Sequence, residues 1–161
     1  MILVIGYGNP LCGDDGIGPY AVEQLELGAD AEARGDVECL TFRQLTPELA
    51  EPISRADTVI FVDAAAGGAP GYITCRELMP LARPPITAPG AFTHHVKVAV
   101  LLENARLLYG KYPPAYLYTV SGENFNLGDS FSSEVEAALP SLLDQLKARI
   151  AQCMNSASLK Q

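Results

Sequence analysis

The 161-residue sequence contains no tryptophan, only two histidines, little positive charge and no long apolar run. Lysine and arginine together number 11 against 19 aspartates and glutamates, which gives a formal net charge of -8. A surface of this sign repels nucleic acid and anionic membranes, so we expect neither as a partner. No apolar stretch approaches the roughly 20 residues of a membrane-spanning helix, and the first residues lack the pattern of a signal peptide. We therefore expect a cytoplasmic protein.

The cysteines are too scattered to suggest a zinc site or a redox pair, since no two of them are closely spaced. We expect reduced thiols at all four positions, which are Cys12, Cys39, Cys75 and Cys153. A chain of 161 residues with 48% hydrophobic and 19% charged residues can bury one sizeable core but not two. We assign a single domain to residues 1–154 and expect residues 155–161 to form a frayed tail.

Strand-like and helix-like stretches alternate along the chain, which is typical of an α/β fold. The expected strands are 1–5, 37–42, 57–62, 72–78 and 116–120, and the expected helices are 16–27, 46–54, 93–109 and 133–150. No helix separates the strands at 57–62 and 72–78, so we expect the second to run antiparallel to the first. The pattern predicts a three-layer α/β/α sandwich whose mostly parallel, twisted sheet has about five strands, one of them antiparallel.

Three local signals refine this assignment. Thr46 followed by Pro47 is typical of a helix start. Ser133 and Glu136 have the spacing of a capping box at the start of the last helix, and Pro140 is expected to kink that helix. The proline-rich residues 80–90 predict an extended surface loop.

The stretch from residue 2 to residue 18, ILVIGYGNPLCGDDGIG, joins a buried strand to a helix through a glycine-rich loop. Dinucleotide-binding folds also begin in this way, but they need a third glycine where the helix packs on the strand. Leu11 occupies that position here. Asp14 and Asp15 would repel a phosphate from the helix N-terminus, and no P-loop lysine follows. A nucleotide-binding oxidoreductase is therefore the weaker alternative.

The Asp14–Asp15 pair has two interpretations. Aspartate is a favoured N-cap, and the helix dipole stabilises it by about 1 kcal/mol. One aspartate satisfies that requirement, which leaves the second without a structural reason. The other interpretation is that Asp15 is a metal ligand while Asp14 caps the helix. Taken by itself, this stretch favours capping.

Other candidate ligands fall at the same edge of the expected sheet. In an open α/β sheet, ligands collect outside the carboxyl ends of the strands. Asp15 follows the first strand, Asp63 ends the strand expected near the sheet centre, and His94 and His95 begin a helix on the same rim. Each residue alone has a structural explanation, as a cap or a strand-end hydrogen-bonding group. Together they suit a borderline divalent metal such as Ni²⁺ or Zn²⁺.

The motif GYGNPLCGDDGIG at residues 6–18 resembles the opening motif of the nickel–iron hydrogenase maturation endopeptidases. Three later stretches are similar to the same family and follow in the right order: VDA at 62–64, THH at 93–95, and SFSSEV at 130–135 running into ALP at 138–140. The first motif is the specific one, and the similarity spans nearly the whole chain.

The resemblance implies a cytosolic endopeptidase that removes a short C-terminal extension from a hydrogenase large-subunit precursor once nickel has been inserted. It implies that Asp15, Asp63 and His94 are the catalytic, metal-binding residues, with His95 as the alternative to His94. The nickel would come with the substrate, and zinc is a possible occupant of the same site. Asn9 is expected to contact the peptide, and Asp14 to support the substrate side or to cap the helix.

The sequence departs from the family pattern in two places. The position of Asp15 holds glutamate in some relatives, so this ligand is one methylene shorter. Residues 43–48 replace a Gly-Gly-Thr-like turn and look more like members that serve soluble, NAD(P)-linked hydrogenases. The alternative from another class is a nickel-binding maturation chaperone, which would use the same ligands without hydrolysis.

Overall fold

The computed structural model describes residues 1–28, 35–81 and 94–158, apart from the side chains of residues 94, 95, 157 and 158. Strands and helices alternate along it, as the sequence predicts. The elements in chain order are β1 (Ile2–Tyr7), the 3₁₀ helix η1 (Gly13–Gly16), α1 (Ile17–Leu27), β2 (Val37–Phe42), the 3₁₀ helix η3 (Pro47–Leu49), α2 (Ala50–Arg55), β3 (Thr58–Ala66), β4 (Ile73–Leu78), α3 (His94–Tyr109), β5 (Ala115–Gly122) and α4 (Ser133–Ser158).

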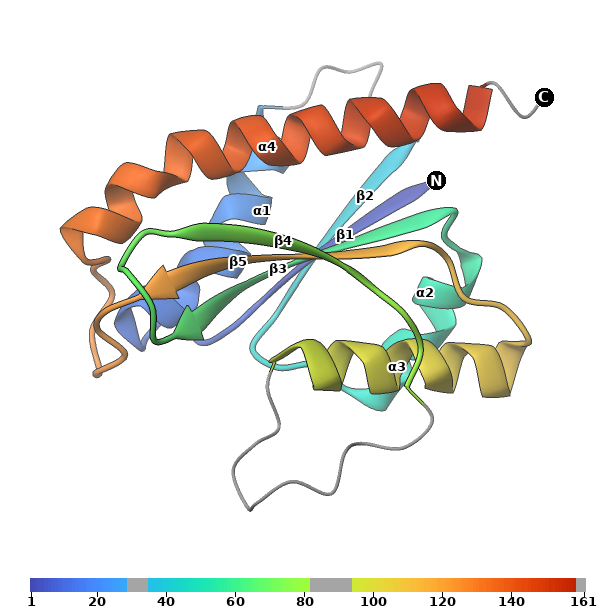
Figure 1. Cartoon of the computed structure of the whole chain (residues 1–161), viewed down its shortest axis with the longest axis horizontal. Coiled ribbons are helices and arrows are strands. Elements are labelled where there is room, and N and C mark those ends of the chain that lie inside the picture. The colour runs from blue at the N-terminus through green and yellow to red at the C-terminus, as the bar shows by residue number, and fades with distance from the viewer. Residues whose placement is uncertain (29–34, 82–93, 159–161) are drawn as a thin grey trace.

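The strands form one sheet in the order β2-β1-β3-β5-β4 (Figure 1). Strand β1 pairs in parallel with both β2 and β3, and β5 pairs in parallel with β3. Strand β4 is the antiparallel member, but its partner is β5 and not the preceding strand β3. The predicted fold is confirmed, and so is the direction of β4, which runs antiparallel to β3 although β5 lies between the two strands.

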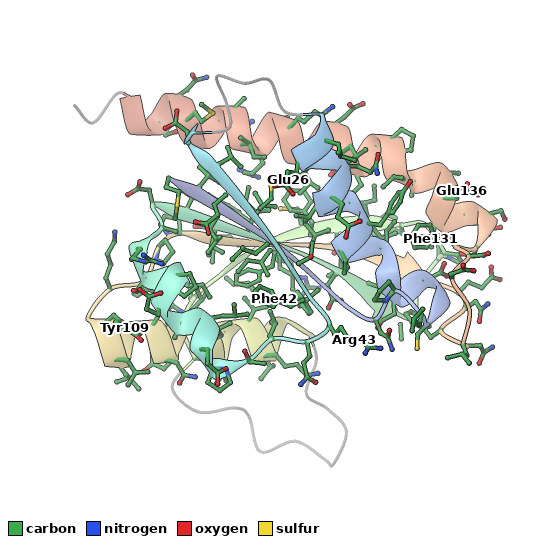
Figure 2. The ribbon with its side chains drawn as sticks, turned by 180° about the vertical axis from the view of Figure 1, so that it is seen from behind. Glu26, Phe42, Arg43, Tyr109, Phe131 and Glu136 are labelled. Carbon is green, nitrogen blue, oxygen red and sulfur yellow. The ribbon has the colours of Figure 1, made fainter. Side chains whose placement is uncertain are left out.

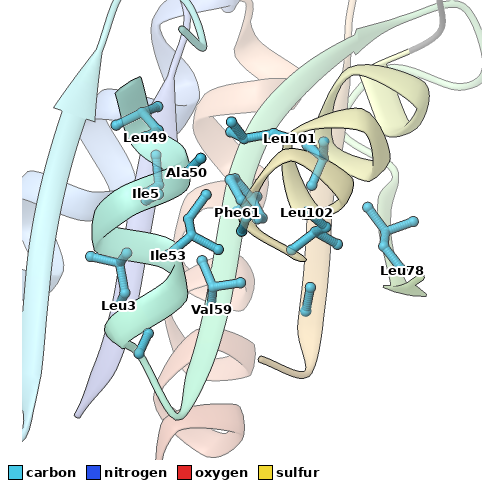
Figure 3. Close-up of a cluster of buried hydrophobic side chains, with 14 of the residues drawn as sticks. Leu3, Ile5, Leu49, Ala50, Ile53, Val59, Phe61, Leu78, Leu101 and Leu102 are labelled. Carbon is cyan, nitrogen blue, oxygen red and sulfur yellow. The ribbon is translucent and has the colours of Figure 1, made fainter. Parts of the chain in front are cut away.

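Two apolar cores hold the layers together, one on each face of the sheet (Figure 1). Alternate residues of β1 and β3 point to opposite faces, which is the period-2 pattern of a buried strand. On one face, α2 and α3 cover a core drawn in Figure 3, which includes Leu3, Ile5, Ile53, Phe61 and Leu102. On the other face, α1 and α4 cover Val4, Val22, Ile60, Val62 and Leu142. The sheet is therefore buried on both faces, as parallel sheets require.

Several predicted boundaries and caps need correction. Strand β3 continues to Ala66, so Asp63 lies within the strand and not at its end. Ser133 hydrogen-bonds the neighbouring Glu134 carboxylate at 2.8 Å, so the predicted capping box is absent. Thr46 makes no side-chain cap, and its helix begins as the 3₁₀ turn η3. Helix α4 continues through Pro140 to Ser158, so residues 155–158 are helical and not a frayed tail.

Close contact at one glycine sets the position of α1. A Cβ atom on Gly18 would lie 2.3 Å from the Val62 carbonyl oxygen and 2.8 Å from that of Tyr7. Helix α1 therefore begins directly against the end of β1 and the middle of β3. Gly18 fills the close-packing role that the sequence pattern had assigned to the position of Leu11.

Two other expectations concern the chain as a whole. The four cysteines are free thiols, as predicted. None of the helices within the described ranges combines the length and the apolar character needed to cross a membrane.

Most of the loop expected at 80–90, together with Thr93, lies outside the described residues.

Candidate active site

Asp15 lies after β1, at the point where the order in which strands are added to the sheet switches sides. From β1 the chain continues to β2 on one side and later to β3 on the other, and ligands of open α/β sheets bind at such a point. One oxygen of the half-buried Asp15 carboxylate accepts a hydrogen bond from the backbone amide of Asn9 at 2.6 Å. The loop can fold back this tightly because Gly8 has a φ of 139°, and a Cβ there would meet the Asp15 carbonyl oxygen at 2.0 Å. The fold thus fixes the Asp15 carboxylate at the end of β1.

Asp63 brings a second carboxylate to the same edge from the neighbouring strand. Its side chain is 1% exposed, and one of its oxygens accepts a hydrogen bond from the Ala64 amide at 2.8 Å. Within β3 it follows Val62, and it lies in register with Thr119 of β5. Because side chains alternate along the strand, Asp63 is on the face that α2 and α3 cover. A carboxylate buried on this otherwise apolar face is an unusual feature.

Tyr7 is a further residue whose hydroxyl feels the charges of both carboxylates, and it was not singled out from the sequence. It is the last residue of β1, one position beyond the Gly6–Val62 pair, and so comes opposite Asp63. Its side chain is 5% exposed, and its ring packs edge-on against Phe61 with centroids 6.5 Å apart. Burial, and then the charges of Asp63 and Asp15, raise the pKa of Tyr7 well above its ordinary value. The Tyr7 hydroxyl therefore stays protonated at neutral pH.

The Tyr7 hydroxyl lies close enough to Asp63 for the carboxylate charge to act on it. The two side chains nevertheless do not have the geometry of a hydrogen bond, and the hydroxyl has no hydrogen-bond partner among the described residues. The charge of Asp63 can act on the hydroxyl without a hydrogen bond, because a Coulomb interaction has a longer range. The sequence does carry a signal for Tyr7. It is a polar residue at the end of an apolar strand.

Asp14 is fully buried and holds a distant loop in place. Its carboxylate accepts hydrogen bonds from the amides of Glu123 at 2.8 Å, Asn124 at 2.9 Å and Ser132 at 2.7 Å, and from the Ser132 hydroxyl at 2.8 Å. Burial by itself would raise the pKa of Asp14, but these hydrogen bonds outweigh burial and lower it below the ordinary value. Asp14 is 0% exposed, so in this structure its carboxylate contacts only the protein, and its support of the substrate side stays a prediction.

The capping interpretation of the aspartate pair is also wrong. The N-cap of α1 is Gly16, and no side chain caps the helix there. The 3₁₀ turn η1 holds both aspartates and shifts them upstream of the first turn of α1. Instead of capping a helix, Asp14 joins the loop before α1 to the loop before α4.

Backbone hydrogen bonds reinforce the connection between these two loops. The Gly13 amide donates to the Gly128 carbonyl oxygen, and the Gly128 amide donates to that of Leu11, each at 2.8 Å. Phe131 also packs edge-on against Tyr20 of α1 with ring centroids 5.4 Å apart. The loop that carries Asp15 therefore has a rigid support on its outer side.

The Asn9 side chain connects several residues at the rim of the site through hydrogen bonds. Its side-chain oxygen accepts hydrogen bonds from the Leu11 amide at 3.1 Å and from Arg43 at 3.0 Å, and its side-chain nitrogen donates to the Cys12 sulfur at 3.2 Å. Arg43 directly follows β2 and brings a positive charge to the same rim (Figure 2). Contact between Asn9 and a substrate stays a prediction.

Comparison with known proteins identifies the architecture. No family model and no curated protein matches the chain. Solved structures do match over nearly its full length. The hydrogenase maturating endopeptidase HybD from E. coli is 24% identical and has a TM-score of 0.70, with 94% of this chain and 92% of that one covered. The chain has the hydrogenase maturation protease fold.

Two further structures with this maturation-protease fold are similar. One is the [NiFe] hydrogenase maturation protease HycI from Thermococcus kodakarensis KOD1, at 21% identity and a TM-score of 0.68, with 94% of this chain and 92% of that one covered. The other is the hydrogenase 2 maturation peptidase from Thaumarchaeota archaeon SCGC_AB-539-E09, at 24% identity and a TM-score of 0.64, with coverages of 92% and 97%. These neighbours agree with the fold that the sequence predicts.

Within this maturation-protease fold, α3 begins on the side of the molecule where β3 and β5 end (Figure 1). The backbone of His94 is the first residue of α3, which agrees with its expected place on the rim. The side chains of His94 and His95 lie outside the described residues, so the choice between them stays open. Among the side chains that the structure describes, no three histidine, cysteine, aspartate or glutamate residues gather into a metal-binding group. The ligand set of Asp15, Asp63 and His94 stays a prediction.

Proposed function

We propose that this protein is an endopeptidase that removes the C-terminal extension of a nickel–iron hydrogenase large-subunit precursor after nickel insertion. The observation that carries the proposal is that Asp15 follows β1 and that Asp63 lies in β3 beside the end of β1, in a fold shared with hydrogenase maturation proteases. The family motif at residues 6–18 supports the same function, because it contains the Asp15 position.

The metal in this proposal belongs to the substrate. Carboxylate and imidazole groups suit a borderline divalent ion such as Ni²⁺. Asp15 and Asp63, with His94 as the expected third ligand, would hold the nickel that the precursor carries. Zinc could occupy the same group of ligands. A bound metal supplies Lewis-acid polarisation of a carbonyl or a water.

The residues of the chain hold and orient the precursor. Asp63 is fixed by the Ala64 amide and Asp15 by the Asn9 amide, so both carboxylates are ordered before a substrate arrives. In the reaction, water adds to the carbonyl carbon of the scissile peptide, the C–N bond breaks, and a proton is transferred to the leaving amine. The net charge of -8 favours a precursor segment that contains basic residues, and we expect the reaction to take place in the cytoplasm.

The experiment is the incubation of the purified protein with nickel-loaded precursor, followed by intact-mass spectrometry. We expect the wild-type protein to release a C-terminal peptide, and Asp15→Asn and Asp63→Asn each to slow this cleavage by about 100-fold or more. Asp144→Asn is the matched control, because Asp144 is exposed on α4 and far along the chain from the site. Wild-type rates in both site variants would refute the site assignment. Binding without cleavage by the wild-type protein would indicate a chaperone.

A further inference from the structure

A row of polar side chains crosses the sheet at its carboxyl edge, on the face of α2 and α3. Tyr7, Asp63, Thr119 and Thr74 come from β1, β3, β5 and β4, and each lies in register with the next. The Thr74 and Thr119 hydroxyls are 2.6 Å apart and hydrogen-bond each other. The row before it on the same face is apolar over β1, β3 and β5, where it consists of Ile5, Phe61 and Leu117. The change from apolar to polar side chains on this face therefore falls at the level of Asp63.

Within this row, the Tyr7 hydroxyl is the group whose role the fold does not explain. The two threonine hydroxyls satisfy each other, and Asp63 accepts a hydrogen bond from the Ala64 amide. The Tyr7 hydroxyl is buried and has no hydrogen-bond partner among the described residues. Because a buried donor without an acceptor lowers the stability of a fold, such groups are rare in proteins and often functional.

The packing of Tyr7 does not require its hydroxyl. The contact with Phe61 is made by the aromatic ring, and phenylalanine would supply the same ring. What the hydroxyl adds is a hydrogen-bond donor on the strand beside Asp63. A tyrosine hydroxyl ordinarily has a pKa of about 10, so it is protonated near neutral pH. It is therefore available to donate a hydrogen bond to a ligand.

We propose that the Tyr7 hydroxyl is a catalytic hydrogen-bond donor that binds the carbonyl oxygen of the scissile peptide between Asp15 and Asp63. This inference rests on the proposed endopeptidase function. When water adds to the carbonyl carbon, that oxygen gains negative charge, and the hydrogen bond from Tyr7 strengthens. Tyr7 does not transfer its proton, so it is chemically unchanged by the reaction. A preorganised donor in a site that excludes water stabilises such a charge more than water does.

The test compares cleavage of nickel-loaded precursor by the wild-type protein and by Tyr7→Phe across a range of pH. We expect kcat to fall by about 100-fold at every pH on the plateau of the profile, with KM changed by less than about threefold. Tyr7→Phe should unfold at the same or a higher temperature, because the variant loses an unpaired buried hydroxyl and keeps the ring.

The matched control is Tyr118→Phe. Tyr118 is also buried, at 3% exposure, but it lies on the opposite face of the sheet, where Arg149 donates to its hydroxyl at 3.3 Å. Removal of this hydroxyl should leave kcat and KM unchanged.

Two results would overturn the inference. One is a Tyr7→Phe variant whose kcat is within about threefold of the wild-type value. The other is a loss of activity that disappears as the pH is raised, because the loss of a donor that is protonated throughout this range should not depend on pH. If the wild-type protein itself does not cleave the precursor, the proposed function fails, and this inference fails with it. Cleavage by both proteins at equal rates refutes the inference alone.

Discussion

Replacement of Asp14 by asparagine tests whether the loop before α4 depends on one buried carboxylate. Asparagine has nearly the same shape but is neutral, and it has one acceptor oxygen in place of two. If this oxygen replaces the one that meets the Glu123 and Asn124 amides and the Ser132 hydroxyl, three hydrogen bonds survive. The new NH₂ group then faces the Ser132 amide, so two donors oppose each other. In the wild-type protein the Ser132 amide nitrogen is 2.7 Å from the Asp14 carboxylate oxygen at this place.

The size of the effect follows from these bonds. A hydrogen bond to an ionised group contributes about 1 kcal/mol more than a neutral one, so the three surviving bonds lose about 3 kcal/mol together. The unpaired Ser132 amide adds about 1–2 kcal/mol, and the smaller desolvation cost of a neutral side chain offsets part of the sum. We expect Asp14→Asn to lower the free energy of unfolding by about 3 kcal/mol.

Urea unfolding at pH 7, followed by circular dichroism, measures this change. With a slope of about 2 kcal/mol per molar urea, the midpoint should fall by about 1.5 M. The exposed Asp144→Asn variant should change the free energy of unfolding by less than about 0.5 kcal/mol. A loss below about 1 kcal/mol in Asp14→Asn would refute the role of the buried carboxylate.

The dependence on pH gives a second test of the same reasoning. The pKa of Asp14 is lowered in the folded protein, so its contribution is present above the ordinary aspartate pKa of about 3.9 and is lost as pH falls through the folded value. The stabilities of wild type and Asp14→Asn should therefore converge at low pH. A constant difference from pH 7 down to pH 2 would show that the charge of Asp14 is not involved.

Two other predictions concern the packing of α1 and the third ligand. Gly18→Ala should lower the free energy of unfolding by about 3 kcal/mol or more in urea, because its Cβ would lie 2.3 Å from the Val62 carbonyl oxygen. Gly35→Ala, where a Cβ meets no atom within 4 Å, is the control, and equal stability of the two variants would contradict the packing argument. In the precursor-cleavage assay, His94→Ala should reduce the rate by about 100-fold while His95→Ala retains it, and the reverse result would assign the ligand to His95.

Much of the fold could be predicted from the sequence because its signals are local. The apolar run at the N-terminus predicted β1, and helical spacing after Gly16 predicted α1. The end of β3 was missed because residues 64–66 are alanines, which have low strand propensity and are held there by pairing with β5. The partner of β4 depends on where β5 enters the sheet, which no local pattern determines.

The candidate site also contains some residues that the sequence predicts and others that only the tertiary structure reveals. Asp15 and Asp63 could be assigned to one edge because each follows or lies within a recognisable strand. The role of Asp14 could not be predicted, since its partners Glu123 and Ser132 are 109 and 118 residues away in the sequence. Tyr7 was visible as part of the motif at residues 6–18, but its burial and missing partner depend on the tertiary structure.

The most direct test of the account compares two forms of one precursor. The purified protein is mixed with nickel-loaded and with nickel-free hydrogenase large-subunit precursor, and the masses of both products are measured over time. We predict loss of a C-terminal peptide from the nickel-loaded form alone, because the proposed function has Asp15 and Asp63 recognise the metal that the precursor carries. Equal cleavage of both forms would contradict recognition through the metal. Cleavage of neither form would contradict the proposed endopeptidase function.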